Sequence, residues 1–331
     1  MTDLTCFEIC AGAGGQSLGL ERAGFTHVAA VEIEFEACAT LRLNRPGWHV
    51  IERDVHSVDA KQFSGVDLFA GGVPCPPFSI AGKRLGEDDE RDLFPRALDM
   101  VADAQPRAVM LENVKGLATA RFADYRAQIF ERMSKMGYVC DWQVLNASEF
   151  GVPQLRPRFI LVGLRAADFE HFRWPASVGA PPTVGKVLKR LMTADGWPGA
   201  AMWATRANTI GPTLVGGSRK HGGPDLGPTR ARAEWLRLGV DGKGLADAPP
   251  TIRHPPHHVP RLTLPMAAAV QGFPPEWRFA GRKTAAYRQI GNAFPPPVAE
   301  AVGHSIRAAL EAAMSSVSGE RAERESWLLE V

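Results

Sequence analysis

Short apolar runs alternate with longer helical stretches through the first half of the chain. The runs predict strands over residues 6–10, 27–33, 66–72, 107–114 and 158–164. The segments between them have helical patterns over residues 16–24, 35–44, 93–104 and 123–137. Strands that alternate with helices indicate an α/β fold whose parallel sheet is covered by helices on both faces. Ligands bind such sheets beyond the carboxyl ends of the strands.

The pattern changes near residue 168, where Gly and Pro become dense and helical periodicity fades. We therefore expect one domain over 1–167, a smaller loop-rich domain over 168–280, and a return to the first domain over 281–315. Residues 316–331 are expected to form a flexible tail. No apolar run approaches membrane-spanning length and the N-terminus lacks a signal-peptide pattern, so the expected location is the cytoplasm.

Charge is distributed unevenly along the 331 residues. The net charge is +2, but residues 181–264 hold twelve Lys or Arg against five Asp or Glu, a local charge of +7. This segment fits either a surface that binds a polyanion or an ordinary solvated surface, and charge alone leaves both open. The five cysteines form no C-x-x-C pair, and the HPPHH segment lacks helical spacing and a fourth ligand. Neither a disulfide framework nor a metal site is expected.

A glycine turn follows the first predicted strand. Its glycines, which allow a ligand to approach the backbone closely, are Gly12, Gly14 and Gly15. The dinucleotide fingerprint requires a third glycine where this chain has Ser17. Glu32 ends the second strand, where an acid can accept both ribose hydroxyls, and Asp54 follows the next apolar stretch and can accept from an adenine amino group. The set fits S-adenosylmethionine better than a dinucleotide, although each acid alone is more typical of a helix start.

Cys75 lies in VPCPP, a stiff and non-helical stretch that suits a nucleophile held in one direction. A free thiol has a pKa of about 8.5, and a strand-end loop near a helix N-terminus and arginines would lower it. Glu112 ends the fourth predicted strand, and Arg156 and Arg158 enter the fifth two residues apart, so they share one face. We expect these four residues to converge at one edge of the sheet.

This combination suits methyl transfer to carbon 5 of cytosine. Carbon 5 is a poor nucleophile, and addition of a thiolate to carbon 6 makes it enamine-like. A carboxylic acid that protonates or hydrogen-bonds N3 stabilises the adduct, and an arginine can hold O2. Carbon 5 then attacks a sulfonium methyl, and loss of its proton and of the cysteine completes the reaction.

The chain resembles the bacterial cytosine-C5-specific DNA methyltransferases of restriction–modification systems. Motifs similar to those of the family occur in the family's order over residues 5–165 and 260–305: FEICAGAGG, GGVPCPPFS, LENV, QLRPR, RLTLPMAAAVQGFP and YRQIGNAF. The resemblance implies a Rossmann-like methyltransferase sheet with a smaller target-recognition domain. It also implies S-adenosylmethionine as methyl donor, S-adenosylhomocysteine as product, and a target cytosine flipped out of duplex DNA.

The family motifs imply roles for individual positions. Cys75 is implied as the nucleophile, Glu112 as the partner of N3, Arg158 as a contact to the base and Arg156 as a support of the site. The implied cofactor-binding residues are Cys10, Gly12, Gly14, Gly15, Glu32, Ile33, Asp54, Val55, Pro74, Leu93, Asn292 and Ala293. The implied DNA-binding residues are Ser79, Thr213, Leu214, Arg219 and Lys220.

Some positions depart from the family pattern or allow another interpretation. Glu8 stands where the family usually has aspartate, Cys10 where it has a cofactor-stacking phenylalanine, and Pro76 where it has glutamine. What covers the adenine in place of the phenylalanine is open. Residues 79–91 are expected to close over DNA. The basic loop that holds Arg219 and Lys220 also fits a flexible solvated loop.

Three alternatives to a DNA methyltransferase remain. An RNA methyltransferase is opposed by the separate basic recognition segment, and a non-catalytic homologue is opposed by Cys75, Glu112 and the two cofactor acids. NAD oxidoreduction is opposed by Ser17. We expect a monomer that acts on double-stranded DNA, with a cognate restriction endonuclease that acts on the same site without a stable complex.

Overall fold

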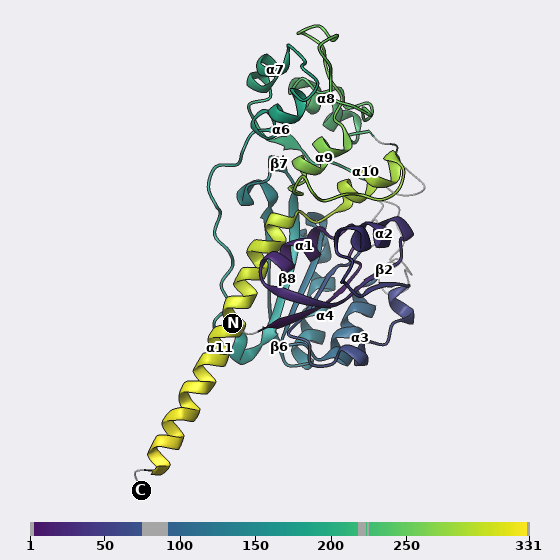
Figure 1. The fold of residues 1–331 in the computed structure, drawn as a ribbon. Coiled ribbons are helices and arrows are strands. Elements are labelled where there is room, and N and C mark those ends of the chain that lie inside the picture. Colours follow the sequence, from purple (N-terminus) through teal and green to yellow (C-terminus); the bar gives the residue numbers. More distant parts are fainter. Residues whose placement is uncertain (1–2, 75–91, 218–222, 224, 330–331) are drawn as a thin grey trace.

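The computed structural model describes residues 3–74, 92–217, 223 and 225–329 (Figure 1). Within these residues the main sheet has, in spatial order, β3 (Val50–Glu52), β2 (Phe25–Glu32), β1 (Leu4–Ile9), β4 (Leu68–Gly72), β5 (Ala108–Val114), β8 (Pro157–Arg165) and β6 (Tyr138–Asn146). The first five of these strands are parallel, and β8 runs antiparallel to both β5 and β6. The predicted α/β class is confirmed, and the sheet is mixed rather than wholly parallel.

The α-helices follow the predicted pattern in the first half of the chain and are more numerous than predicted in the second. They are α1 (Gly15–Arg22), α2 (Phe35–Asn44), α3 (Phe94–Ala104), α4 (Ala123–Lys135), α5 (Ala166–Phe169), α6 (Val184–Met192), α7 (Ala200–Arg206), α8 (Thr229–Arg237), α9 (Leu264–Val270), α10 (Lys283–Asn292) and α11 (Pro296–Leu329). Short 3₁₀ helices are η1 (Val55–Ser57), η2 (Ala60–Phe63), η3 (Lys115–Ala118), η4 (Ala120–Phe122) and η5 (Ala147–Phe150).

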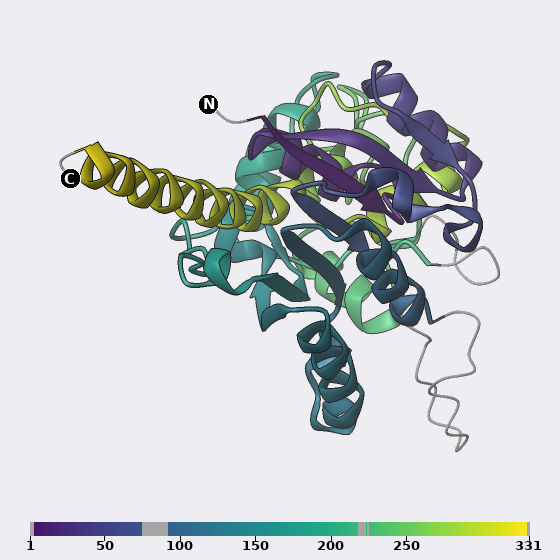
Figure 2. The same ribbon diagram turned by 90° about the horizontal axis from the view of Figure 1, so that it is seen from below.

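Alternate residues of the strands face two separate hydrophobic layers. In β5, Val109 and Leu111 pack with residues of α3 and α4, whereas Ala108 and Met110 pack with residues of α1 and α11. Both faces of the sheet are therefore covered by helices, as Figures 1 and 2 show. The carboxyl ends of the parallel strands remain free to form a site.

The edge strand β6 is absent from the sequence-based prediction. Most of its residues are exposed or half-buried, so its sequence lacks the continuous apolar run of a central strand. Its place in the sheet depends on pairing with β8, from Tyr138 opposite Arg165 to Asn146 opposite Pro157. Pairing with a distant strand is a tertiary contact that local patterning does not report.

A third hydrophobic cluster, which we call the upper cluster, lies above the sheet and is built mainly from α6 to α10 (Figure 1). It includes Trp203 of α7, Trp235 of α8 and Met266 of α9, and it reaches Leu18 of α1. A two-stranded parallel sheet, β7 (Gln154–Leu155) with β9 (Gly211–Pro212), links this part to the strand β8 that follows β7. The helix α10, which lies beyond residue 280, contributes Tyr287 and Ile290 to the upper cluster. The domain division at 167 and 280 stays a prediction.

The last helix, α11, packs on α1 and then projects beyond the body (Figures 1 and 2). Gly19 permits the close approach, because a Cβ there would lie 2.5 Å from both the Ala299 Cβ and the Pro296 carbonyl oxygen. The expected flexible tail over 316–331 is helical up to Leu329 in the structure. Its sequence contains four Glu, two Arg and two Leu, which favour helix, and no proline. Within the described residues, no helix combines the length and apolar character needed to cross a membrane.

Candidate active site

A cavity of about 750 Å³ opens at the carboxyl ends of the parallel strands. Its described wall includes Glu32 at the end of β2, Gly12 after β1, Gly72 at the end of β4 and Glu112 near the end of β5. Asp54, which follows β3, extends the wall further along the same edge. The order of the strands therefore arranges these groups in the sequence Asp54, Glu32, Gly12, Gly72, Glu112 across the sheet.

Most of the predicted cofactor residues line this cavity. They are Cys10, Gly12, Gly15, Glu32, Ile33, Asp54, Val55, Pro74, Leu93, Asn292 and Ala293. Gly14 is not part of the described wall. It has φ of 83°, and a Cβ there would lie 2.7 Å from Cζ2 of Trp277. Gly14 therefore permits close packing of the turn against Trp277.

The turn between β1 and α1 has an unusual backbone. Cys10 has φ of 51°, a left-handed conformation that is uncommon outside glycine, and Gly12 has φ of 54°. Burial raises the pKa of the Cys10 thiol, and the nearby Glu32, Glu8 and Asp54 carboxylates raise it further. The side chain is therefore a small neutral group in the cavity wall.

Glu32 shapes the turn through its carboxylate. Oε2 accepts from the Gly12 N–H (2.7 Å), and Oε1 accepts from the N–H groups of Ile33 and Glu34 (both 2.8 Å). Burial raises the pKa of this carboxyl, and the three backbone donors oppose the rise. A carboxylate offers about four lone-pair directions, so Oε2 retains capacity for a further donor from a ligand.

Asp54 is more exposed and caps η1. Its Oδ1 accepts from the His56 N–H and lies 2.8 Å from His56 Nδ1. These hydrogen bonds hold the pKa of Asp54 below its usual value, so the group is a carboxylate at neutral pH. With Oδ1 engaged by His56, the second oxygen is the natural acceptor for a ligand amine.

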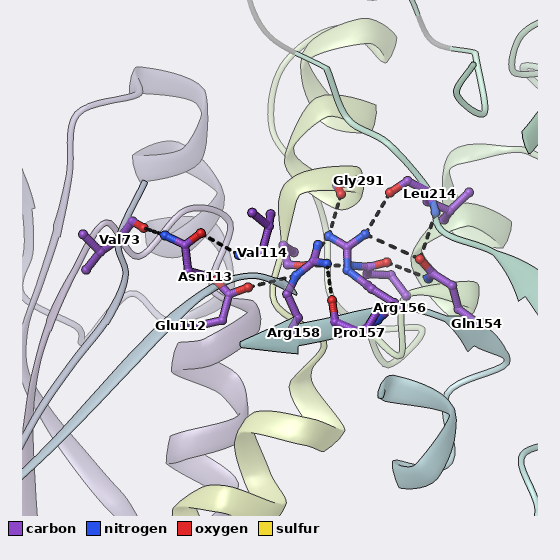
Figure 3. A network of polar contacts seen from close by, with 12 residues as sticks. Val73, Glu112, Asn113, Val114, Gln154, Arg156, Pro157, Arg158, Leu214 and Gly291 are labelled. Carbon is purple, nitrogen blue, oxygen red and sulfur yellow. Dashed lines mark hydrogen bonds and ion pairs between the residues drawn. The ribbon is translucent and has the colours of Figure 1, made fainter. Parts of the chain in front are cut away.

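Glu112 and Arg158 form an ion pair at the opposite end of the cavity (Figure 3). The distance from Arg158 Nε to Glu112 Oε1 is 2.8 Å, and each side chain is 12% exposed. Strands β5 and β8 position the pair, since Val114 lies opposite Arg158 in their antiparallel register. Burial raises the pKa of Glu112, while Arg158 and Arg156 oppose the rise. Two predicted catalytic residues are thus brought into direct contact.

The side chain of Asn113 contacts Val73, at the start of the segment that leads to Cys75. Its Nδ2 donates to the Val73 carbonyl (2.8 Å), as Figure 3 shows, and the Leu93 N–H donates to the Pro74 carbonyl (3.3 Å). Cys75 and Ser79 themselves lie outside the described residues. Asn113 was not predicted as a positioning residue, although the LENV motif contains it and its side chain is a buried amide that needs partners.

Arg156 is not part of the described cavity wall. Its guanidinium is buried and donates to the carbonyls of Leu214 (2.8 Å), Gly291 (2.7 Å) and Ala293 (3.0 Å) (Figure 3). Although Arg156 and Arg158 are two residues apart, Arg156 joins the β7–β9 region to the end of α10, whereas Arg158 pairs with Glu112. Arg156 is thus a structural bridge between chain segments, and its supporting role at the site stays a prediction.

A buried amide network surrounds this guanidinium. Gln154 Nε2 donates to Gln271 Oε1 (2.8 Å), and Gln154 Oε1 accepts from the Leu214 N–H (2.9 Å). Gln271 Nε2 donates to the Ala293 carbonyl (2.5 Å). Sequence reasoning missed both glutamines, because their partners are brought near only by folding.

The predicted DNA-binding residues of the second part have varied environments. The Leu214 side chain is fully buried in the upper cluster rather than on a surface open to DNA. The Thr213 hydroxyl donates to the Leu155 carbonyl (2.6 Å) and so fixes the β7–β9 junction. Arg219 and Lys220 lie outside the described residues. Asn292, at the end of α10, donates to the Gly217 carbonyl (3.1 Å) and also lines the cavity.

Two further observations bear on what the site can bind. Gln16 lines the cavity and is 3% exposed, yet neither its amide nitrogen nor its amide oxygen has a hydrogen-bond partner. Gln16 was not predicted as a site residue, because a glutamine after a glycine turn does not by itself indicate a binding role. In the described part of the chain, no group of three or more His, Cys, Asp or Glu residues is arranged to hold a metal ion.

Comparison with known proteins shows that the sequence of this chain matches a known family. The model of the C-5 cytosine-specific DNA methylases matches residues 4–308. Type II methyltransferase M.NaeI of Lentzea aerocolonigenes is 58% identical, over 94% of this chain and 76% of its own length. Type II methyltransferase M.NgoMIV of Neisseria gonorrhoeae is 50% identical, over 93% of this chain and 98% of its own length. The chain belongs to the C-5 cytosine-specific DNA methylases.

Solved structures agree with this at the level of the fold. A DNA modification methyltransferase encoded within an E. coli prophage has a TM-score of 0.65 at 24% identity, over 93% of this chain and 100% of that chain. DNMT2 of Spodoptera frugiperda has a TM-score of 0.64 at 15% identity, over the same shares. Because identity is this low, the likeness concerns the fold alone.

The Arg156 bridge predicts a large effect of a substitution remote from the cavity. Arg156→Met keeps the side-chain length but removes the Arg156 hydrogen bonds to the carbonyls of Leu214 and Gly291, while the Ala293 carbonyl keeps Gln271 Nε2 as a donor. The free energy of unfolding should therefore fall by about 3 kcal/mol in urea titrations. Arg190→Met is the matched control, because Arg190 is exposed, and should change this value by less than about 0.5 kcal/mol. Equal stability of the two variants would contradict the bridge.

The raised pKa of Glu112 predicts a pH-dependent stability. The folded state binds this proton more tightly than the unfolded chain, so the group's stabilisation is complete below about pH 4.3 and is lost as the pH rises through the raised pKa. The stability of Glu112→Gln relative to the native chain should therefore increase between about pH 4 and pH 8, measured by urea unfolding.

Glu131→Gln is the control with opposite sign. Lys135 lowers the pKa of Glu131, so the relative stability of this variant should decrease, weakly, as the pH rises to about 5 and stay constant above that. A Glu112→Gln trend that is flat or follows the Glu131→Gln trend would refute the assignment.

Proposed function

We propose that this chain methylates one cytosine in a specific duplex DNA sequence and draws the methyl group from S-adenosylmethionine bound in the 750 Å³ cavity. The observation that carries the proposal is the joint placement of two groups of residues. The acids Asp54 and Glu32 stand at one end of the cavity wall, and Glu112, which pairs with Arg158, stands at the other. A nucleoside-bearing methyl donor and a cytosine can therefore approach each other across neighbouring strand ends.

The donor set of the cavity fits this cofactor. The free oxygen of Asp54 suits the adenine amino group, and the remaining capacity of Glu32 Oε2 suits a ribose hydroxyl. Val55 and Leu93 supply apolar wall for the base. When bound, S-adenosylmethionine supplies an electrophilic sulfonium methyl group. Cys10 supplies no aromatic face, so the aliphatic side chains of Val55 and Leu93 are proposed to cover the adenine.

Glu112 and Arg158 are proposed to hold the cytosine. A carboxyl whose pKa is raised retains a proton more readily, so Glu112 can donate to N3 of the base. The Arg158 guanidinium, held by Nε against Glu112, has further N–H donors for O2.

Cys75 is proposed as the nucleophile that adds to carbon 6. It follows Pro74, whose carbonyl accepts from the Leu93 N–H, and Val73, whose carbonyl accepts from Asn113. These contacts fix the start of the Cys75 segment beside Glu112, since β4 pairs with β5 there. A thiolate approaching from this side would meet a base held at N3 and O2.

The biological setting is proposed from the relatives. Both M.NaeI and M.NgoMIV are named Type II methyltransferases, and their alignments cover the upper cluster as well as the sheet. We assign this chain to the same class, acting in the cytoplasm as a monomer and paired with an endonuclease that shares its site. The +7 charge of residues 181–264 supports a role for this part of the chain in binding DNA phosphates.

Trapping of the covalent adduct tests the nucleophile. Random-sequence duplex DNA substituted with 5-fluorocytosine should form a denaturant-resistant complex with the native chain and S-adenosylmethionine, and Cys75→Ala should abolish it. An excess of tRNA should leave the complex unchanged. A complex that persists in Cys75→Ala would reject this nucleophile, and efficient competition by tRNA would favour an RNA substrate.

Sequence mapping tests the proposed biological role. Plasmid DNA treated with the purified chain and S-adenosylmethionine should carry 5-methylcytosine at one position of a single short sequence, read by bisulfite sequencing. The same DNA should then resist an endonuclease that cuts this sequence, and DNA treated with Cys75→Ala should remain sensitive. Methylation scattered over cytosines with no shared flanking sequence would contradict a protective role.

A further inference from the structure

The side chain of Gln16 is a buried amide without a partner in the wall of the cavity. The residue is 3% exposed, and both Nε2 and Oε1 lack hydrogen-bond partners. Burying an amide without hydrogen bonds is costly, and most buried polar side chains in folded proteins are paired. A ligand in the cavity that supplies both a hydrogen-bond donor and a hydrogen-bond acceptor would pair the two amide atoms, and this would explain why they lack partners in the protein.

The location of Gln16 identifies which part of the ligand it faces. It is the second residue of α1, which follows β1, and β1 lies between the strands that carry Glu32 and Gly72. Gln16 is thus placed along the cavity between the proposed ribose acid and the strand end that leads to Cys75. Gly15 lies against the end of α10, since a Cβ there would come within 2.1 Å of the Phe294 carbonyl oxygen. The amide therefore stands in a corner closed by α1 and residues 293–294.

This corner is suited to an amino acid group. No acidic side chain occupies the first turn of α1, and Gly14 at its N-cap provides no side-chain cap. The N-terminal end of a helix favours a carboxylate, because its N–H groups are unpaired and its dipole is positive there. A carboxamide beside it offers an N–H donor to a carboxylate and an oxygen acceptor to an ammonium group.

We propose that the Gln16 carboxamide recognises the amino acid end of the cofactor, with Nε2 donating to its carboxylate and Oε1 accepting from its ammonium group. The inference rests on the proposed function, since it places S-adenosylmethionine in this cavity. It assigns Gln16 a binding role that separates cofactors with an amino acid end from nucleosides that lack one.

Two probes of different length test the inference directly. S-adenosylhomocysteine carries the amino acid end, and 5′-methylthioadenosine has the same nucleoside and thioether without it. Gln16→Leu should weaken binding of S-adenosylhomocysteine by about tenfold to a hundredfold in isothermal titration, which is the loss expected for hydrogen bonds to charged groups. The affinity for 5′-methylthioadenosine should remain within about twofold of the native value.

Thermal unfolding without ligand provides a readout besides binding. Leucine removes an unpaired buried amide, so the free Gln16→Leu variant should melt at the same temperature as the native chain or higher. Ser17→Ala is the matched control. Ser17 Oγ is also buried without a partner, but Ser17 is not part of the described cavity wall, so both affinities should be unchanged. Gln16→Met repeats the test with a flexible side chain of similar length.

The outcomes separate this inference from the proposed function. If the native chain binds neither probe, the cofactor assignment fails. If the native chain binds both and Gln16→Leu and Gln16→Met weaken both to the same extent, or weaken neither, the role assigned to Gln16 is wrong. Selective loss of S-adenosylhomocysteine, with an unchanged or raised melting temperature, supports it.

Discussion

The buried guanidinium of Arg156 is the interaction on which the arrangement of the site depends. It is a cation with no carboxylate against it among the described contacts; carbonyl oxygens of Leu214, Gly291 and Ala293 hold it instead. Burying a cation is costly unless hydrogen bonds compensate, so the paired donors of both terminal nitrogens favour the contact between these segments, while Nε stays unpaired. Because Arg156 is two residues from Arg158, the same contacts that join the upper cluster to the sheet also fix the strand that carries the base-binding arginine. The end of α10, which closes the cofactor cavity, is positioned by the same group.

The site combines two electrostatic environments along one sheet edge. Asp54 is largely exposed and stabilised as a carboxylate by His56, whereas Glu112 is desolvated and its pKa is raised even with Arg158 in contact. The order of the parallel strands separates these two acids by the width of three intervening strand ends. Aspartate and glutamate have similar intrinsic pKa values, so position in the sheet produces the difference between the two acids. Asp54 is a carboxylate that accepts hydrogen bonds, and Glu112 is a carboxyl that can retain a proton.

Sequence patterning predicted the strands β1, β2, β4, β5 and β8 and the helices packed on them, because central strands and amphipathic helices have strong local signals. It did not predict β6, whose half-exposed residues depend on pairing with β8. It also missed the helices of residues 184–237, where Gly- and Pro-rich connections dilute short helical patterns. Among site residues, Glu112 was found from its motif, while Asn113 and Gln16 were not, because an amide has no distinctive chemistry until its partners are known.

The sequence by itself determined the α/β class, the order of the motifs, and the acids and arginines that the chemistry needs. These follow from residue type and from spacing along one chain, which are local properties. The tertiary structure decided that Arg156 contacts backbone carbonyls whereas Arg158 pairs with Glu112. It also decided that the side chain of Leu214 is buried and that Gln16 lines a cavity with its amide unpaired. Those properties depend on contacts between segments far apart in sequence. Burial and hydrogen-bond satisfaction exist only after such segments have come together, so no local pattern encodes them.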